Sequence, residues 1–355
     1  RLLLLMMTFL LGLALSACGG GAGNTSGNNN NANNNAGQTN GQEAGDEIQS
    51  LTIKISHVVA ENTPKHQGAL RIKEYIEEKS GGKIEVEIYP NSSLFGDQDE
   101  YQNLVANNVQ FIIPDISKLV GHNPQWNIPS MPFLFDSDET AIAFWDGEKG
   151  QQILRNLEKD GVIGLYMWPN GEKHLTNNVR PIEKPEDLKG LKIRTQSGQV
   201  QETIFKLLGA SSESIPFGEL YTALEQGVVD GQDNTFSNIE SKRFDEVQKY
   251  LTVIGHNRVD YAIFTNTKFW NSLNEPTRKL IEEGVWEGTQ VARAKAKELN
   301  ENAFEAIKQR GNVEIIELTP EQRQAFRDVL QPIYDEYAPI IGEDVIQDAL
   351  SRNSQ

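Results

Sequence analysis

The sequence predicts a two-lobed α/β fold, and three observations indicate it. Strand-like and helix-like segments alternate over residues 51–113, which is typical of right-handed βαβ units and a largely parallel sheet. The alternation restarts after a proline-rich stretch with Pro124, Pro129 and Pro132. Residues 276–310 then follow one helical pattern, roughly 50 Å long at 1.5 Å per residue, which exceeds one small lobe. We therefore expect two lobes with this helix lying across both.

The predicted first lobe covers residues 48–170. Leu51–Ile55 and Ile84–Ile88 alternate between apolar and polar side chains, as strands with one wet face do. Between them, Thr63 and Pro64 supply the N-cap and the first-turn proline of a helix. The apolar stripe of this helix is Ala69, Ile72 and Ile76. A further helix is expected over residues 97–107, and further strands over residues 111–113 and 162–168.

The predicted second lobe covers residues 171–265. Its expected strands are residues 191–195, 253–254 and 261–265, and its expected helices are residues 199–208 and 218–226. The C-terminal part, residues 266–355, carries the long helix, a strand over residues 313–316 and helices that cross back over both lobes. The buried stripe expected on the long helix is Ile281, Val285, Ala292, Ala296, Leu299, Ala303 and Ile307.

The N-terminal segment predicts export and lipidation. Leu2–Leu15 is an apolar run that is short for a transmembrane helix, and it ends in a lipobox, Leu15-Ser16-Ala17-Cys18-Gly19. We expect residues 1–18 to be a lipoprotein signal peptide and Cys18 to be acylated; the alternative is an uncleaved anchor or an ordinary signal peptide. Residues 19–47 are rich in Asn and Gly, and such a segment is typical of a flexible tether.

Composition excludes several classes of function. A net charge of −17 would repel nucleic acid, so no nucleic-acid partner is expected. Cys18 is the single cysteine, so the folded part has no thiol for catalysis or metal binding. The five histidines are scattered without ligand spacing, and no catalytic motif is present. We therefore expect no catalytic residue, no metal and no cofactor.

Arg194 is the most informative polar residue. It lies at the carboxyl end of a predicted central strand, where a buried charge needs a partner, and its planar guanidinium matches a carboxylate. An internal ion pair is the alternative. Phe217 follows another strand end and is a candidate aromatic wall, or else ordinary core. Asn234 follows a glycine turn, and its amide is a candidate ligand group or a helix N-cap.

Several motifs recur in a fixed order along the chain. They are Glu78–Ile84, Tyr89–Leu94 with Gly96, Met131–Phe135, Arg180–Ile182, Pro185–Arg194 and Val229–Gln232 with Asn234. Together they resemble the DctP-type solute-binding proteins of tripartite ATP-independent periplasmic (TRAP) transporters, and the likeness runs from about Thr52 to Glu343. The resemblance implies a class II-like periplasmic-binding-protein fold whose two lobes close like a hinge around a ligand. It also implies that Arg194 binds a substrate carboxylate, with Phe217 and Asn234 beside it.

Three further site residues follow from the resemblance. Lys173 stands where relatives often have a second basic residue, usually Arg, and would contact a ligand oxygen. Gln98 lies in a loop where Phe95 is an addition relative to many family members, so its placement depends on the alignment. Asp115 stands where an acidic pocket residue occurs and would accept a ligand hydroxyl, unless it is a turn residue.

We therefore expect an extracytoplasmic, lipid-anchored receptor that binds a small organic acid anion and delivers it to TRAP permease subunits in the membrane. A C4-dicarboxylate is favoured over a sugar acid such as a uronate or a sialic-acid-like compound. A ligand-sensing module for a signalling receptor is an alternative, and a secreted hydrolase or lyase is the third possibility. Since no catalytic constellation is present, we do not expect an enzyme.

Overall fold

The computed structural model describes residues 47–354, which belong to one compact unit. The expected signal peptide over residues 1–18, its Cys18, and all but the last residue of the expected tether lie outside the described residues. None of the helices that the structure describes is both long and apolar enough to cross a membrane.

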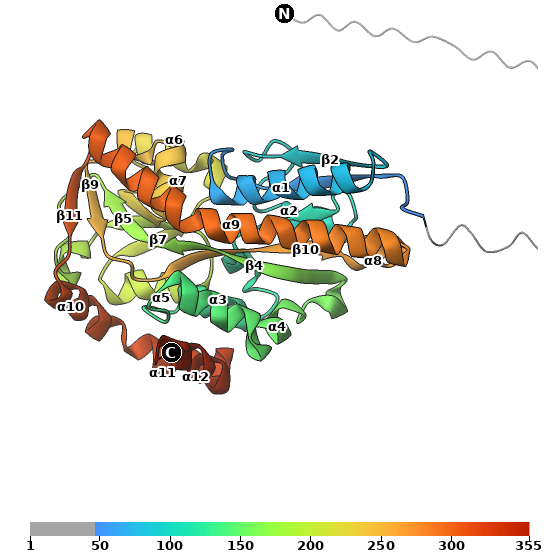
Figure 1. Ribbon diagram of the computed structural model, residues 1–355. Coiled ribbons are helices and arrows are strands. Elements are labelled where there is room, and N and C mark those ends of the chain that lie inside the picture. The colour runs from blue at the N-terminus through green and yellow to red at the C-terminus, as the bar shows by residue number, and fades with distance from the viewer. Residues whose placement is uncertain (1–46, 355) are drawn as a thin grey trace, which may run out of the picture. The chain divides into compact units, whose positions relative to one another are not determined.

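Two β-sheets organise the described residues, one in each lobe (Figure 1). Within residues 47–354, the first sheet has five strands in the order β2-β1-β3-β10-β4, and the second has six in the order β11-β9-β5-β8-β6-β7. The strands are β1 (Leu51–Ser56), β2 (Ile84–Tyr89), β3 (Phe111–Ile112), β4 (Val162–Glu172), β5 (His174–Asn177), β6 (Lys192–Thr195), β7 (Ser211–Ser214), β8 (Gly231–Asn234), β9 (Tyr250–Val253), β10 (Arg258–Asn266) and β11 (Glu314–Glu317).

Both sheets are mixed, so the expectation of a largely parallel sheet holds for β1, β2 and β3, the strands of residues 51–113, but not for either sheet as a whole. β1 is parallel to β2 and β3, but β10 is antiparallel to β3 and β4. In the second sheet β6 is parallel to β7 and β8, whereas β5 is antiparallel to β8 and β9. The reason is the path of the chain, which leaves the first lobe along β4 and returns along β10 in the opposite direction.

The position of β10 differs from one expected lobe assignment. Residues 261–265 were expected in the second lobe, but they belong to β10 and therefore to the first sheet. The chain crosses between the lobes at Lys173, between β4 and β5, and again over residues 254–257, between β9 and β10. Lys173 N–H donates to the carbonyl of Asn257 at 2.8 Å, so the two crossings lie side by side.

Helices cover the sheets, and their bounds are close to the expected ones. The α-helices are α1 (Pro64–Lys79), α2 (Glu100–Val105), α3 (Asp138–Asp146), α4 (Glu148–Leu154), α5 (Gln199–Leu207), α6 (Leu220–Glu225), α7 (Phe236–Ser241), α8 (Thr267–Ser272), α9 (Glu275–Arg310), α10 (Pro320–Leu330), α11 (Pro332–Ile341) and α12 (Glu343–Ser351). The 3₁₀ helices are η1 (Ile116–Leu119), η2 (Pro124–Ser130), η3 (Glu158–Asp160), η4 (Pro185–Leu188), η5 (Phe217–Glu219), η6 (Phe244–Glu246) and η7 (Arg352–Ser354).

The first helix forms as its sequence predicts, with one difference at its start. Ala69, Ile72 and Ile76 are fully buried in α1, and full burial of an isoleucine contributes about 1.5–3 kcal/mol. Thr63 occupies the N-cap position, but its hydroxyl donates to the carbonyl of Ala60 at 2.6 Å instead of accepting a bond from the helix. The first-turn proline and the buried apolar stripe therefore stabilise the helix, without a side-chain N-cap bond.

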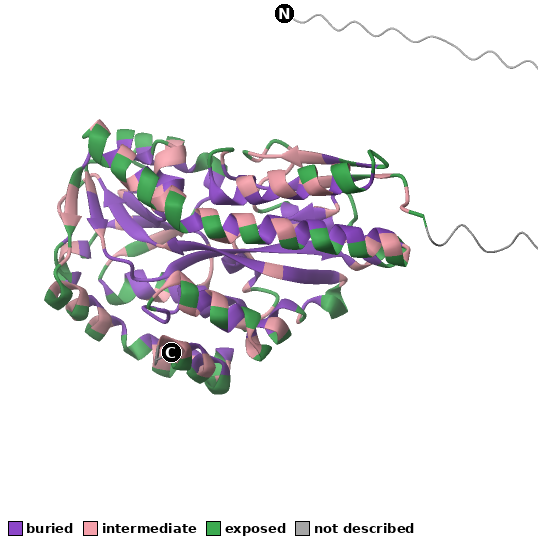
Figure 2. Ribbon diagram, in the orientation of Figure 1, coloured by how far each residue is buried: buried purple, intermediate pink, exposed green. Residues whose placement is uncertain are grey.

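The long helix α9 spans both lobes, as the sequence predicts. It packs against α1 and β4 of the first lobe and against α7 of the second (Figure 1). Buried and exposed residues alternate along α9 (Figure 2). Its buried residues include the expected stripe except Leu299, which is half-buried, and they also include Gly284 and Gly288. These glycines allow close approach, since a Cβ at Gly288 would lie only 2.5 Å from the carbonyl oxygen of Gly68 in α1.

Candidate functional site

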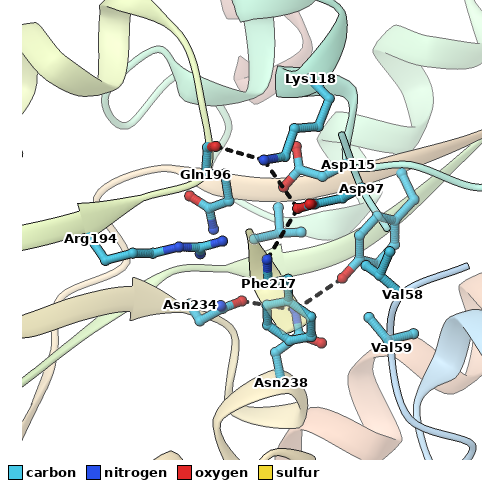
Figure 3. Close-up of a pocket in the computed structure, with 12 residues that line it drawn as sticks. Val58, Val59, Asp97, Asp115, Lys118, Arg194, Gln196, Phe217, Asn234 and Asn238 are labelled. Atoms are coloured by element: carbon cyan, nitrogen blue, oxygen red, sulfur yellow. Dashed lines mark hydrogen bonds and ion pairs between the residues drawn. The ribbon is translucent and has the colours of Figure 1, made fainter. Parts of the chain in front are cut away.

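A pocket of about 330 Å³ lies between the two lobes (Figure 3). From the first lobe, its lining comes from the loops that follow β1, β2 and β3, from η1 and from β10. From the second lobe, it comes from the ends of β6 and β8, from η5 and from α7. Ligands in open α/β sheets bind beyond the carboxyl ends of strands, and this pocket lies there for β1, β3, β6 and β8. The lining residues are Val58, Val59, Asp97, Asp115, Lys118, Arg194, Gln196, Phe217, Asn234, Asn238, Val259 and Tyr261.

Arg194 extends from β6 toward this pocket (Figure 3). Its Nε and Nη2 both donate to the carbonyl of Ile215, at 2.9 and 2.8 Å, so one edge of the guanidinium is held by the backbone. Its Nη1 is buried and has no hydrogen-bond partner among the described residues. The Arg194 side chain therefore lies at the pocket, and its Nη1 is available to donate to another group.

The charge of Arg194 is buried without a close internal counter-ion. Its nearest acids, Asp97, Asp233 and Asp115, act at longer range, and none in residues 47–354 forms an ion pair with it. Burial lowers the pKa of Arg194, although these carboxylates oppose the shift. A guanidinium keeps its charge in proteins, and a buried charge without a partner is destabilising. The site is therefore suited to an anion that supplies the missing charge.

The opposite wall carries both signs of charge. Lys118 of η1 pairs with Asp97, with 3.1 Å between Nζ and Oδ2, and it also donates to the carbonyl of Gln196 at 2.8 Å. Asp115 lies beside them and accepts a hydrogen bond from the backbone N–H of Ser117 with one carboxylate oxygen, at 2.8 Å. Asp115 is thus both a turn residue and a pocket residue, which are the two roles that the sequence left open.

Amide and phenol groups form the third side. Asn234 ends β8, and its Oδ1 accepts from Nδ2 of Asn238 at 2.8 Å and from the backbone N–H of Thr235 at 3.1 Å. Asn238 also donates to the hydroxyl of Tyr261 at 2.9 Å. Because these oxygens already accept bonds, Nδ2 of Asn234 is the group of this side chain best suited to donate to a ligand oxygen.

Phe217 and two valines supply apolar contact. The ring of Phe217 lies 6.0 Å from the guanidinium carbon of Arg194, near the limit of a cation–π contact, and packs edge-on against Phe244 at 5.9 Å. Phe217 is therefore both a core residue and a wall of the pocket. Val58 and Val59 face the same space from the loop after β1 (Figure 3).

A second lysine lies behind the pocket. Lys65 of α1 is buried, donates to the carbonyl of Ile113 at 2.7 Å and lies over the Tyr261 ring, with Nζ 3.5 Å from its centre. Burial lowers the pKa of Lys65 to about 8, while the acids around it oppose the shift. Burial likewise raises the pKa of Glu100 to about 8. Lys65 thus lies against Tyr261, and neither Lys65 nor Glu100 lines the pocket.

Two of the residues expected in the site lie outside its lining. Gln98 is exposed on the surface, and the pocket residue of that loop is its neighbour Asp97. Lys173 is fully buried at the first lobe crossing, where it pairs with Asp233 at 2.8 Å and donates to Oε1 of Gln196 at 3.1 Å. Its ammonium is committed to these two partners, so it is not in the position of a direct ligand contact.

Sequence reasoning missed Asp97, Lys118, Gln196, Asn238 and Tyr261. Gln196 had a usable signal, because it follows Arg194 by two residues at the end of the same strand. The other four carry no local motif. As to metals, the described residues contain no group of three or more His, Cys, Asp or Glu side chains placed to hold an ion.

Comparisons with known proteins agree on one family. A family model described as bacterial extracellular solute-binding protein, family 7 (DctP), matches residues 55–339. The C4-dicarboxylate-binding protein DctB of Bacillus subtilis is 39% identical over 300 residues, which cover 84% of this chain and 86% of the relative.

Solved structures agree with this assignment. A TRAP periplasmic solute binding protein from Shewanella oneidensis, with bound succinate, has a TM-score of 0.84 and 37% identity, and the match covers 85% of this chain and 99% of that one. The sugar acid binding protein DctPAm from Advenella mimigardefordensis, in complex with galactonate, has a TM-score of 0.84 and 29% identity, covering 87% and 99%. Since the family model and the relatives span most of the folded part, the chain belongs to the DctP family of bacterial extracellular solute-binding proteins, the binding component of TRAP transporters.

Proposed function

We propose that this chain captures an organic acid anion outside the cytoplasm and delivers it to a TRAP permease, without turning it over. The observation that carries this proposal is Arg194, whose buried guanidinium has a free Nη1 at the pocket and no internal carboxylate partner among residues 47–354. A ligand carboxylate would supply both the missing acceptor and the missing charge. Hydrogen bonds to charged groups contribute about 1.5–3 kcal/mol each.

The pocket favours a small acid such as a C4-dicarboxylate. The space left between its lining side chains is small, which favours a ligand of few heavy atoms. Micromolar affinity needs about −8 kcal/mol, which for about eight heavy atoms approaches the ceiling for tiny ligands. Such a ligand must be enclosed and must have nearly all its oxygens paired. The Bacillus subtilis relative is named for C4-dicarboxylates, and the Shewanella oneidensis structure holds succinate.

A sugar acid is the second candidate, and two acidic side chains in the pocket favour it. Asp97 and Asp115 face the pocket opposite Arg194 (Figure 3). Carboxylates accept hydrogen bonds from hydroxyl groups but repel a second carboxylate. A hydroxylated acid would satisfy both of them. The Advenella mimigardefordensis relative holds galactonate, so this pocket architecture is compatible with such ligands.

Delivery would depend on closure and on tethering. The lobes meet across the pocket through Lys118 and Gln196 and through Asp97 and Phe217, and a closed surface of this kind is what a permease would recognise. We propose that acylated Cys18 holds the receptor at the outer face of the cell membrane, or at the periplasmic side of a membrane, with residues 19–47 as the tether. Two acyl chains suffice for stable anchoring.

A thermal-shift screen tests this function. The purified protein is heated with succinate, malate, fumarate, galactonate and glucuronate, each over a range of concentrations. At 100 times its dissociation constant, a true ligand stabilises the protein by about 2.7 kcal/mol. We expect at least one of these acids to raise the melting temperature and neutral analogues such as succinamide to leave it unchanged. Absence of any shift with all five acids would contradict the proposal.

A further inference from the structure

Gln196 lines the pocket beside Arg194, and its backbone is held on every side. Its carbonyl accepts hydrogen bonds from Lys118 at 2.8 Å and from the hydroxyl of Ser214 at 2.9 Å. Its N–H donates to Oε1 of Gln201 at 3.3 Å. The side chain is 5% exposed. With the main chain fixed, the direction of the amide is what decides whether a donor or an acceptor faces the pocket.

Lys173 settles that direction. An ammonium group can only donate hydrogen bonds, so the 3.1 Å contact of its Nζ must be to Oε1 of the Gln196 amide. The same ammonium pairs with Oδ2 of Asp233 at 2.8 Å, and Nε2 of His256 lies 3.1 Å from the same oxygen. The side chains of Lys173, Asp233 and His256 are all buried.

The carboxylate of Asp233 is held in its charged form. Burial opposes ionisation of Asp233, but the charge of Lys173 and the bond from His256 outweigh it and hold the pKa of Asp233 well below its usual value. Asp233 therefore stays charged and keeps Lys173 in place. Breaking a buried ion pair by removing one partner is strongly destabilising, which makes this a rigid support for the amide.

The nitrogen of the Gln196 amide has a weaker internal partner than the oxygen. Nε2 of Gln196 donates to the carbonyl of Asp233 at 3.4 Å, which is a long hydrogen bond, and this uses one of its two hydrogens. We infer that the second N–H of Gln196 is a ligand-binding donor next to Arg194, and that Lys173 is a positioning residue that fixes it there. This inference rests on the proposed function, because it adds a contact to the same carboxylate.

The substitution Gln196→Glu tests the donor. It keeps the shape of the side chain, and its carboxylate still accepts from Lys173, but an acceptor oxygen replaces the N–H at the pocket. We expect the affinity for the acid found in the screen, measured by calorimetry, to fall about 100-fold or more. The exposed Gln226→Glu carries the same change of charge in the same lobe, and should bind within about twofold of wild type.

A double-mutant cycle tests the positioning role. Lys173→Met lets the amide turn over, and we expect it to weaken binding about tenfold in the wild-type background but less than about twofold in a Gln196→Ala background. Lys173→Arg, which is also donor-only, should retain most of the affinity. A structural role alone would give equal losses in both backgrounds, and that result would overturn the positioning role.

Gln196→Glu keeps the inference testable even if Lys173→Met fails to fold. Wild-type-like binding by Gln196→Glu, within about threefold, would overturn the donor role. If Arg194→Lys abolishes binding while Gln196→Glu does not, this inference fails and the proposed function stands. If wild-type protein binds none of the acids, the proposed function itself fails.

Discussion

The backbone N–H of Phe217 donates a hydrogen bond to Oδ2 of Asp97 at 3.2 Å, and this bond joins the second lobe to the first across the pocket. The same carboxylate oxygen pairs with Lys118, which in turn donates to the carbonyl of Gln196. These contacts lie at the pocket and not at its rim. The residues that join the lobes here therefore also line the pocket.

Asp97→Ala should shift the ligand-free protein toward an open form, because it removes the acceptor for Phe217 and the partner of Lys118. We expect a larger radius of gyration by small-angle X-ray scattering and an affinity lower by about tenfold, in proportion to the lost closed population. The control is Asp99→Ala, which changes an exposed acid two residues away. An unchanged radius for Asp97→Ala would show that this contact does not hold the lobes together.

Gly288→Ala should destabilise the fold. A Cβ at this position would lie 2.4 Å from Cγ1 of Ile72 and 2.5 Å from the carbonyl oxygen of Gly68, so α9 would have to move away from α1. We expect a loss of about 1–3 kcal/mol in the free energy of unfolding, measured with urea. Gly121→Ala is the matched control, since a Cβ there has open space, and it should change stability by less than about 0.5 kcal/mol.

Acid should destabilise the protein through His174. The ring is 5% exposed and stacks on Phe236 at 3.9 Å, and burial lowers its pKa to about 3, with the nearby charges of His256 and Arg323 adding to the shift. The unfolded state therefore binds the extra proton between about pH 6.5 and pH 3, and stability falls as the pH falls, by up to about 1.4 kcal/mol per unit.

His174→Phe keeps the stack and removes this proton. Its free energy of unfolding, from urea titrations at pH 7, 6 and 5, should fall less than that of wild type, by about 0.7 kcal/mol between pH 7 and 6 and by about 1.2 kcal/mol between pH 6 and 5. Other buried histidines, such as His57, whose pKa burial also lowers, keep part of the acid sensitivity in both proteins. Parallel pH profiles would mean that His174 is not held neutral in the folded state.

Cys18→Ser should release the protein from the membrane. Without the thiol no acyl chain can be attached, and residues 19–47 have too few apolar side chains to hold a membrane by themselves. We expect labelled palmitate to be incorporated into wild type but not into this variant, and the variant to appear in the soluble extracytoplasmic fraction. Labelled Cys18→Ser protein, or wild type without label, would disprove lipidation at this residue.

Much of the fold could be predicted because its signals are local. The helix over Pro64–Lys79 and the long helix to Arg310 each carry an apolar stripe at helical spacing and a clear beginning. Which sheet Arg258–Asn266 joins could not be predicted in this way. That strand pairs with a segment almost a hundred residues earlier, and its own sequence does not indicate which strand it will pair with.

The site residues also differ in how well the sequence predicts them. Arg194, Phe217, Asn234 and Asp115 lie at or just after the carboxyl ends of strands, where ligand sites are expected, and all four line the pocket. Lys173 also lies at a strand end, but its direction is set by Asp233, sixty residues later, which draws the ammonium into the interior. A single charged side chain gives no sign in the sequence of whether its counter-ion will be a ligand or another part of the protein.

In the loop before α2, the error has a different cause. We expected Gln98 in the pocket, and the structure places Asp97 there. A loop has no periodicity from which the direction of each side chain can be inferred, so a shift of one residue is enough to exchange a surface residue for a pocket residue.

The measurement that tests the central claim most directly is calorimetric binding of the acid identified in the screen to wild type and to Arg194→Lys, with both melting temperatures in the absence of ligand. A lysine keeps the positive charge but cannot both hold the carbonyl of Ile215 and present a second donor to a carboxylate. We predict an affinity lower by about 100-fold or more, with nearly the same ligand-free melting temperature. Wild-type affinity in the variant, or a variant that is badly destabilised without ligand, would show that Arg194 has a structural role and would contradict this account.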